Sequence, residues 1–431
     1  MLSADWSHSH CRGVARMVLF EPETVPRGWR RAVRRVDWTL LLLLTLALGF
    51  GLIAVYSATS SAGMHHFFSR QLFSAAVGTG LLLLVARFPR PWLERFAPIA
   101  YGVGLLLLLL VLLLGRTVYG SKSWLSFAGF SFQPVEVAKV TTVLLLARFL
   151  SVEGRSLRQL STLVKALALI GAPTGLVLLQ PDAGSALVFF ALCVGLLLWG
   201  KAHPLVVMMP VLLPLVALLS LLGTVPLLLG ILAGSVGIFL LRPHPIAAVV
   251  CIAIVTGTGW GSSALYQMLK PHQQARIQSF LRPEEDPQGS GYHIIQSVLA
   301  IGSGGLTGKG FQQGTQTQLR FIPKQWTDFI FCVPAEEFGF LGAVLVLAVL
   351  FGLIWHVFSL AHRFEHDPFW SLLLAGIGSI WFFHTAVNIG MALGLAPVIG
   401  LPLPLLSAGG SALVANLTFA GLVFNAYRHL S

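Results

Sequence analysis

Three consecutive acidic residues stand out in the segment LRPEEDPQGSGYHIIQ, residues 281–296. Only 16 of the 431 residues are Asp or Glu, yet Glu284, Glu285 and Asp286 are adjacent and are followed by a proline and two glycines. Pro287 restricts Asp286 to extended conformations. The charges of the two preceding glutamates are expected to raise the pKa of the Asp286 carboxyl by like-charge repulsion. This combination favours Asp286 as a general base that takes a proton from a hydroxyl group.

Cationic residues occur in the same polar segment, at Lys270, Arg276 and Lys309. Fixed positive charge stabilises negative charge that develops during a reaction. Lys309 belongs to GSGGLTGKG, residues 302–310, which lacks the spacing and the Ser or Thr of a nucleotide-binding phosphate loop. Its backbone N–H groups are nevertheless candidates for holding a pyrophosphate. The alternative is a solvated loop with no chemistry, and we expect at least one of the two glutamates to be only a solvated neighbour.

A second group of ionisable residues interrupts an apolar run. Glu136 and Lys139 are three residues apart at the start of a predicted helix, so they share a face and are expected to form an ion pair. Ionisable groups at membrane depth are costly and by default functional. We therefore interpret the pair as part of the lining of a substrate cavity. A purely structural ion pair is the alternative.

Other polar residues have plainer interpretations. Asp182 follows a proline between two apolar runs, where it is suited to cap the next helix. His384 and Asn388 are four residues apart in one apolar run, which predicts a buried hydrogen-bonded pair rather than metal ligands, because no third ligand is in view. Ser407 and Ser411 flank two glycines, a pattern that lets helices pack closely.

The elements that position these residues are apolar helices. The chain is 56% hydrophobic and only 10% charged, and its mean hydropathy is +0.81, whereas soluble domains carry about 25% charged residues. This composition predicts an all-α polytopic membrane protein. The four cysteines have no C-x-x-C spacing, which indicates neither a metal site nor a disulfide framework. The basic residues form short scattered clusters and no continuous face, which excludes nucleic acid as a partner.

Twelve apolar runs are long enough to span a bilayer. They are residues 37–58, 67–87, 97–114, 134–151, 163–179, 184–200, 203–222, 225–241, 245–265, 334–360, 369–395 and 405–428. Five arginines precede the first run, which places its start in the cytoplasm. Alternate counting then leaves the short outer loops without Lys or Arg and predicts that both termini are cytoplasmic. Residues 1–36 form the predicted cytoplasmic tail, which lacks the apolar region of a cleaved signal peptide, and 266–333 forms a large extracytoplasmic loop.

Several motifs follow one another in a recognisable order. They are VYSATSS at 55–61, FQPVEVAK at 132–139, QPDAGSALV at 180–188, the whole segment 270–342, and NIGMALGLAPVIGLPLPLLSAGGS at 388–411. Together they closely resemble the SEDS family of peptidoglycan glycosyltransferases over most of residues 37–428, which we take as the membrane domain. The segment GTQTQLRFIP, 314–323, is similar to the RodA-like elongation branch rather than to the FtsW-like division branch.

The chain also departs from the family pattern. Ser123, Val135, His272 and Trp326 occupy positions where the family commonly has Arg, Ser, Tyr and His, so the roles of those family side chains are not carried over. Members of the family have ten helices, with one helix where this chain has three apolar runs, 203–265. We therefore expect about twelve transmembrane helices, the family ten and an extra pair. The extra pair keeps the large loop on the outside.

The resemblance implies an enzyme that polymerises lipid II into glycan strands during cell elongation. In the family reaction, the 4-hydroxyl of an acceptor sugar attacks C1 of a lipid-linked donor, inverts that centre and releases undecaprenyl pyrophosphate. The resemblance implies Asp286 as the catalytic residue and substrate-binding roles for Glu136, Lys139, Trp124, Gln133, Asp182, Lys270, Arg276, Gln296, Lys309, Asp328 and Ser407. A divalent cation, Mg²⁺ or Mn²⁺, is compatible with such chemistry, although the sequence shows no dedicated cluster of ligands.

The resemblance also implies partners and a location. The expected partners are lipid II, a class B penicillin-binding protein (a transpeptidase with one membrane helix), and other membrane proteins of the elongation complex. The expected location is the bacterial cytoplasmic membrane, with the active site on its outer face. Two alternatives from other classes remain. A lipid II flippase needs a polar path across the membrane, and a non-catalytic scaffold for cell-wall synthases predicts that the loop carboxylates can be neutralised without effect.

Overall fold

Apolar runs rich in Leu, Val and Ala form the long helices of the protein, and proline begins several of them. The computed structural model describes residues 36–60, 63–118, 121–127, 130–269, 271–282 and 290–430. Pro134, Pro204, Pro245 and Pro368 are each the first residue of a helix, where the missing N–H costs no hydrogen bond and the fixed φ favours the helical turn. The residues from Asp37 onward form one compact unit.

The long helices correspond to the twelve apolar runs. They are α2 (Trp38–Ser60), α3 (His65–Arg87), α4 (Arg90–Leu114), α5 (Pro134–Leu150), α6 (Leu160–Leu179), α7 (Ala183–Trp199), α8 (Pro204–Leu222), α9 (Thr224–Leu240), α10 (Pro245–Met268), α15 (Gly339–Arg363), α16 (Pro368–Ala392) and α17 (Gly410–Tyr427). Within the described residues, nine of these helices are long and apolar enough to cross a membrane, α7 and α9 are shorter apolar helices, and α5 has 17 residues. The predicted all-α polytopic membrane fold is confirmed.

The large loop contains short helices rather than an irregular chain. They are α11 (Pro271–Leu281), α12 (Ser290–Ser303), α13 (Thr315–Gln318) and α14 (Cys332–Glu337). The apolar run 334–360, which we predicted as one helix, is split between α14 and α15. The break falls at Phe338, directly before Gly339, whose φ is +65°. A Cβ on Gly339 would lie 2.3 Å from the backbone nitrogen of Gly308. The loop backbone passes so close that a continuous helix with side chains does not fit.

A small sheet occupies the first polar loop, 115–133, for which the sequence predicted no strands. It consists of β1 (Arg116–Val118), β2 (Ser121–Phe127) and β3 (Phe130–Phe132), paired antiparallel in the order β1-β2-β3. The backbone N–H of Lys122 and the hydroxyl of Ser121 both donate to the carbonyl of Gln180, at 3.2 and 3.0 Å. These bonds fix the sheet to the turn between α6 and α7.

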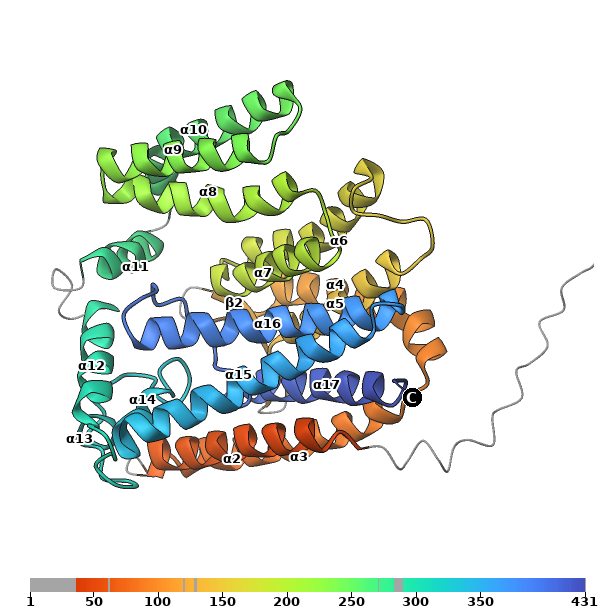
Figure 1. Ribbon diagram of the computed structural model, residues 1–431. Coiled ribbons are helices and arrows are strands. Elements are labelled where there is room, and N and C mark those ends of the chain that lie inside the picture. The colour runs from red at the N-terminus through yellow and green to blue at the C-terminus, as the bar shows by residue number, and fades with distance from the viewer. Residues whose placement is uncertain are drawn as a thin grey trace, which may run out of the picture. The chain divides into compact units, whose positions relative to one another are not determined.

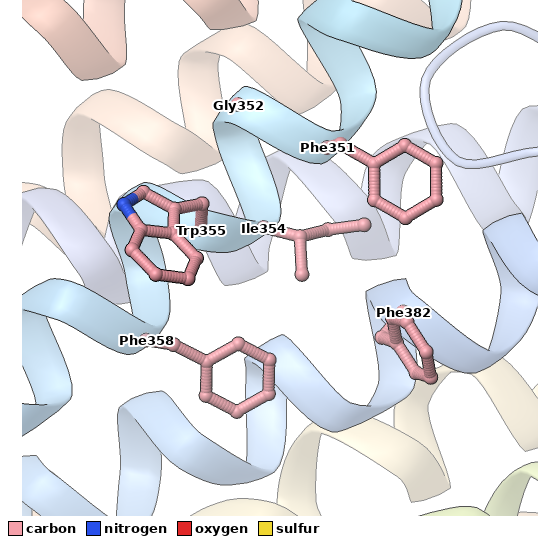
Figure 2. Close-up of a pocket in the computed structure, with 6 residues that line it drawn as sticks. All are labelled: Phe351, Gly352, Ile354, Trp355, Phe358 and Phe382. Carbon is pink, nitrogen blue, oxygen red and sulfur yellow. The ribbon is translucent and has the colours of Figure 1, made fainter.

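Helix α16 is the most buried of the candidate membrane spans among the described residues. In its most apolar stretch, 78% of the residues are buried inside the protein, compared with 22–39% for α2, α3, α4, α6 and α15. It packs against α5, α7 and α15 (Figure 1). The outward faces of α15 and α16 form an apolar groove of about 500 Å³ that includes Trp355 and Phe382 (Figure 2). This groove has no charged lining residue, so it suits acyl chains or another apolar helix.

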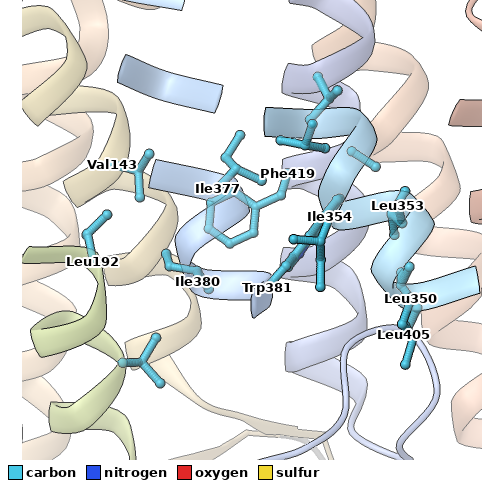
Figure 3. Close-up of a cluster of buried hydrophobic side chains, with 14 of the residues drawn as sticks. Val143, Leu192, Leu350, Leu353, Ile354, Ile377, Ile380, Trp381, Leu405 and Phe419 are labelled. Atoms are coloured by element: carbon cyan, nitrogen blue, oxygen red, sulfur yellow. The ribbon is translucent and has the colours of Figure 1, made fainter. Parts of the chain in front are cut away.

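Small residues allow this central packing. A Cβ on Gly376 of α16 would lie 2.8 Å from Val143 of α5 and 3.2 Å from Leu192 of α7, so glycine sets the approach of three helices. Trp381 and Ile380 of α16 fill the adjoining space (Figure 3). The large indole is satisfied as well, because its N–H donates to Asn416 of α17 at 2.8 Å.

Helices α8, α9 and α10, which fill residues 204–268, pack against one another and reach the rest of the bundle where α8 contacts α7 (Figure 1). They bury a small core of their own, formed by Leu205, Val216, Leu227, Ile238 and Val255. Ser220 of α8 and Ser262 of α10 form a hydrogen bond. The prediction of three helices in 203–265 is confirmed.

The first testable prediction concerns the orientation of these helices. Each of them spans the bilayer once in the predicted topology, so Thr224 faces the outside and Arg242 faces the cytoplasm. In a cysteine-free background, Thr224→Cys should react with a membrane-impermeant thiol reagent added to intact spheroplasts. Arg242→Cys should react only after the membrane is opened. Labelling of Arg242→Cys in intact spheroplasts would contradict the topology.

Candidate functional site

The predicted ion pair forms at the first turns of α5. The ammonium Nζ of Lys139 lies 2.8 Å from Oε1 of Glu136. The two residues are only 3% and 5% exposed, in agreement with their shared helix face. The prediction that they pair is confirmed. A buried charge without its partner is strongly destabilising, so each of these two residues depends on the other.

His384 reaches this pair from α16. Its Nε2 lies 3.4 Å from Nζ of Lys139, and its Nδ1 lies 3.1 Å from the carbonyl oxygen of Pro402. Asn388, one turn further along, donates from Nδ2 to the carbonyls of Asp328 and Leu401, at 2.8 and 2.7 Å. Our prediction that His384 and Asn388 bond to each other is therefore wrong. Both are buried, but the backbone carbonyls of Asp328, Leu401 and Pro402 lie within reach and satisfy them in place of the neighbouring side chain.

The segment before α17 is fastened against the end of the large loop. Ser407 donates from Oγ to the carbonyl of Thr327 at 2.6 Å and accepts from the backbone N–H of Leu403 at 2.8 Å. Gln71 of α3 forms two hydrogen bonds with the same segment. Its amide donates to the carbonyl of Ser407 at 3.0 Å and accepts from the N–H of Gly409 at 3.1 Å. The hydroxyl of Ser407 thus has structural partners on both sides.

These contacts bring together five of the predicted site residues. Gln133 precedes α5, and its backbone N–H donates to Oγ of Ser411 at 3.1 Å. Through this contact, the start of α5 lies beside the segment that carries Ser407, and Asn388 connects that segment to Asp328. We call Gln133, Glu136, Lys139, Asp328, Ser407 and His384 the polar site.

Lys309 belongs to a separate polar cluster that the sequence did not predict. Its Nζ lies 2.7 Å from three oxygens, which belong to Ser303, Thr315 and Glu336. An ammonium group has three N–H donors, and all three are used within the chain. Binding of a pyrophosphate by Lys309 stays a prediction, and it would require the exchange of at least one of these bonds.

Glu336 is the centre of this cluster. Burial favours the neutral form of its carboxyl, but hydrogen bonds outweigh burial and hold the pKa of Glu336 below its ordinary value. The donors are Lys309 and the backbone N–H groups of Gln316 and Thr317, both at 2.9 Å. Glu336 therefore stays ionised and fixes the loop around α13.

The neighbouring Glu337 behaves in the opposite way. Burial raises the pKa of its carboxyl above the ordinary value, even though Ser57 of α2 and Gln318 donate to it. Its Oε2 atom is buried without a hydrogen-bond partner among the described residues. The signal for this pair was present in the sequence, as AEE within an otherwise apolar run, but nothing there showed which loop residues would meet it.

The glycine-rich loop 302–310 does not hold its N–H groups open for a ligand. The N–H groups of Lys309 and Gly310 donate to the carbonyls of Glu336 and Glu337, at 3.1 and 3.0 Å, and that of Gly308 donates to Gly304. A Cβ on Gly308 would lie 2.1 Å from the carbonyl oxygen of Glu337. The expectation of a backbone cradle for pyrophosphate is therefore wrong for these N–H groups, because the glycines serve close contact with α14.

The remaining predicted residues are spread over other elements. Asp182 caps α7, accepting from the N–H and the hydroxyl of Ser185 at 3.0 and 2.8 Å, as its position predicted. Trp124 lies on β2 and Gln296 on α12, both half-buried. Asp286 and Lys270 lie outside the described residues, and of Arg276 only its place on α11 is described. Within the described residues, no three His, Cys, Asp or Glu side chains group as ligands for a metal ion.

A bundle of membrane-spanning helices that encloses a buried ion pair, with polar loop segments packed around it, defines a multi-pass membrane protein with an internal polar site. Comparison with known proteins identifies the family to which this membrane protein belongs. A family model described as FTSW_RODA_SPOVE, cell cycle protein, matches residues 37–222 and 198–431. The two matches overlap at residues 198–222, which include α8. The chain therefore belongs to the FtsW/RodA/SpoVE family, which confirms the resemblance to SEDS proteins.

Individual relatives match over most of their length. The peptidoglycan glycosyltransferase MrdB of Escherichia coli K12 is 35% identical over 397 residues, which cover 91% of this chain and 94% of MrdB. The peptidoglycan glycosyltransferase RodA of Treponema pallidum is 32% identical, with 92% and 98% covered. A solved structure described as the structural coordination of polymerization and crosslinking by a peptidoglycan synthase complex matches with a TM-score of 0.68 and 31% identity, covering 91% of this chain and 98% of that one.

The second testable prediction concerns the ion pair in the polar site. Glu136→Gln or Lys139→Met alone leaves one buried charge without its partner, at a cost of about 3–5 kcal/mol. The double variant should be more stable than the sum of the two losses predicts. Melting temperatures of the purified variants in detergent measure this coupling. Thr142→Val is a matched control on the same helix, because the Thr142 hydroxyl has no partner among the described residues; additive losses would contradict the coupling.

The third prediction compares two adjacent glutamates. Glu336→Gln removes the negative charge beside the Lys309 ammonium and places an NH2 group opposite groups that can only donate, so it should cost about 1–3 kcal/mol. Glu337→Gln mimics the neutral form that burial favours and should cost little. The pKa of Glu336 is lower in the folded protein than in the unfolded chain, where it is about 4.3. The ionised carboxylate therefore stabilises the fold at pH values above the unfolded pKa, and this stabilisation is lost as the pH falls through the folded pKa. Melting curves from pH 3.5 to 7 should show a smaller acid-dependent loss in Glu336→Gln than in the wild type. Equal losses in both proteins would contradict this account.

Proposed function

We propose that this protein is a peptidoglycan glycosyltransferase that polymerises lipid II into glycan strands during cell elongation. The observation that carries the proposal is the polar site, in which a buried ion pair on α5 lies beside the segments of both large motifs, at 326–328 and 401–411. Family membership supports the activity, because relatives that match over most of the chain are named as peptidoglycan glycosyltransferases. The segment GTQTQLRFIP supports the elongation branch.

In the proposed reaction, Asp286 takes the proton of the acceptor's 4-hydroxyl while that oxygen forms a bond to C1 of the donor sugar. The bond between C1 and the pyrophosphate oxygen breaks on the opposite face, so the centre is inverted and undecaprenyl pyrophosphate leaves with the electron pair. The sequence supports this role for Asp286, because Pro287 restricts its backbone and the glycines that follow permit a tight turn.

The departing pyrophosphate needs cations. Lys270 and Arg276 are the better candidates within the loop, because the ammonium of Lys309 has its three donors occupied by Ser303, Thr315 and Glu336. Lys139 has two partners among the described residues, Glu136 and His384, which leaves one N–H for a substrate oxygen. A divalent cation, Mg²⁺ or Mn²⁺, stays a prediction of the sequence, and no step here passes through one.

The proposal places the active site on the outer face of the cytoplasmic membrane and both termini in the cytoplasm, as the distribution of Arg and Lys supports. It further includes a class B penicillin-binding protein as partner, with other membrane proteins of the elongation complex. The solved structure of a peptidoglycan synthase complex that coordinates polymerization and crosslinking supports such a partner.

The fourth prediction tests the proposed function. The purified full-length protein, with and without a class B penicillin-binding protein, should convert labelled lipid II into polymer. The polymer is detected on a gel and should disappear when the sample is treated with lysozyme. Asp286→Asn should lower the rate by about 10²- to 10⁴-fold, the usual loss of a general base. Glu284→Gln and Glu285→Gln are matched controls within the same loop and should be much milder.

The outcomes separate the alternatives. Polymer formed from lipid II supplied on one side of reconstituted vesicles excludes a flippase as the sole function. An Asp286→Asn protein that polymerises near the normal rate would contradict the assignment of the base. Absence of polymer from the wild type with its partner present would overturn the proposed activity and favour a scaffold.

A further inference from the structure

The imidazole of His384 has no part in the proposed reaction, although it contacts the buried cation of the polar site. It is 5% exposed and lies on the most buried helix of the bundle. One ring nitrogen is 3.4 Å from the Lys139 ammonium, and the other is 3.1 Å from the carbonyl of Pro402. A polar ring in this position connects α5, α16 and the 401–409 segment.

The partners of the ring determine where its proton lies. The carbonyl oxygen of Pro402 accepts hydrogen bonds and cannot donate one. The Nδ1 atom of His384 therefore carries the hydrogen. The Lys139 ammonium is donor-only, so Nε2 of His384 must be the unprotonated acceptor. Neutral His384 with its proton on Nδ1 satisfies both contacts, and protonated His384 would place two positive charges next to each other.

The surrounding charges favour the same state. Glu136 and Lys139 are the ionisable groups that form the contact chain with His384. The other titratable charged or His residues described on α16's packing partners and in the 326–328 segment are Arg148, His293, Asp328, His356, His362 and Arg363. The 395–409 segment contains none. Within the contact chain of His384, the carboxylate of Glu136 balances the one cation, that of Lys139.

We propose that His384 is a positioning residue that orients the Lys139 ammonium for substrate. Glu136 takes one N–H of the ammonium and His384 takes a second, so these two acceptors fix the direction of the third. Pro402 in turn fixes the ring through Nδ1. The inference rests on the proposed function, because the third N–H is assigned to an anionic or hydroxyl oxygen of the lipid-linked substrate.

Two substitutions of His384 test the contacts of its two ring nitrogens separately. The terminal amide of Gln occupies the place of Nε2, so His384→Gln keeps an acceptor for Lys139. The amide of Asn occupies the place of Nδ1, so His384→Asn keeps a donor for Pro402 and loses the acceptor. If His384 orients Lys139, the polymerisation activity of His384→Gln should be nearly normal and that of His384→Asn should be impaired.

The test measures lipid II polymerisation by full-length wild type, His384→Gln and His384→Asn at several substrate concentrations. The Asn variant should lose roughly 10- to 100-fold in kcat/KM, because a hydrogen bond to a charged group is lost, and the Gln variant should stay within about threefold of the wild type. In a Lys139→Met background, compared by the binding of lipid II, the two His384 substitutions should have equal effects.

The outcomes distinguish this inference from the proposed function. A wild type that makes no polymer even with the class B penicillin-binding protein present overturns the proposed function, whatever the variants do. An active wild type with an impaired Gln variant and a normal Asn variant overturns the inference, because the bond to Pro402 would then be the one that matters. Equal losses in kcat/KM that follow equal losses in melting temperature also overturn it, since they indicate a merely structural role.

Discussion

The ion pair between Glu136 and Lys139 is buried in a bundle of apolar helices, and its surroundings follow from the cost of that burial. A charge removed from water needs an opposite charge and further hydrogen bonds at close range. Glu136 supplies the charge, and His384 supplies an additional acceptor. The ring of His384 then needs a partner of its own and finds the carbonyl of Pro402. Each contact satisfies one group and requires the next, so the site extends from α5 through α16 to the segment before α17.

Helix α16 makes this chain of contacts possible because it is buried along most of its length. Gly376 lets α5 and α7 approach it closely, and at its other end Asn388 bonds to two separate backbone segments. A helix packed on several sides has little freedom to shift. The positions of His384 and Asn388 are therefore fixed by the packing of apolar residues that have no part in the chemistry.

The large loop is braced by a different set of charges. Glu336 stays ionised, because Lys309 and two backbone N–H groups donate to it, whereas burial favours the neutral form of the adjacent Glu337. The pKa values of two identical side chains thus shift in opposite directions, because the hydrogen bonds to Glu336 outweigh its burial, whereas those to Glu337 do not. The cluster connects the end of α2, the glycine-rich loop and α14. It holds the Lys309 ammonium in the support of the loop, so Lys309 could bind a pyrophosphate only by exchanging at least one of these bonds.

The sequence determined the helices, their approximate ends and the presence of three helices in 203–265, because hydropathy over about 20 residues and the position of proline are local properties. The same holds for the pairing of Glu136 with Lys139, which are one turn apart on a single helix, and for the family, whose motifs are local. The tertiary structure decided which distant groups meet. His384 forms hydrogen bonds with Lys139 and Pro402 rather than with Asn388. The ammonium of Lys309 bonds to Glu336 within the loop, which the sequence did not predict. Sequence spacing does not specify these partners, because long-range contacts depend on how the helices pack and on which backbone groups that packing leaves without a hydrogen bond.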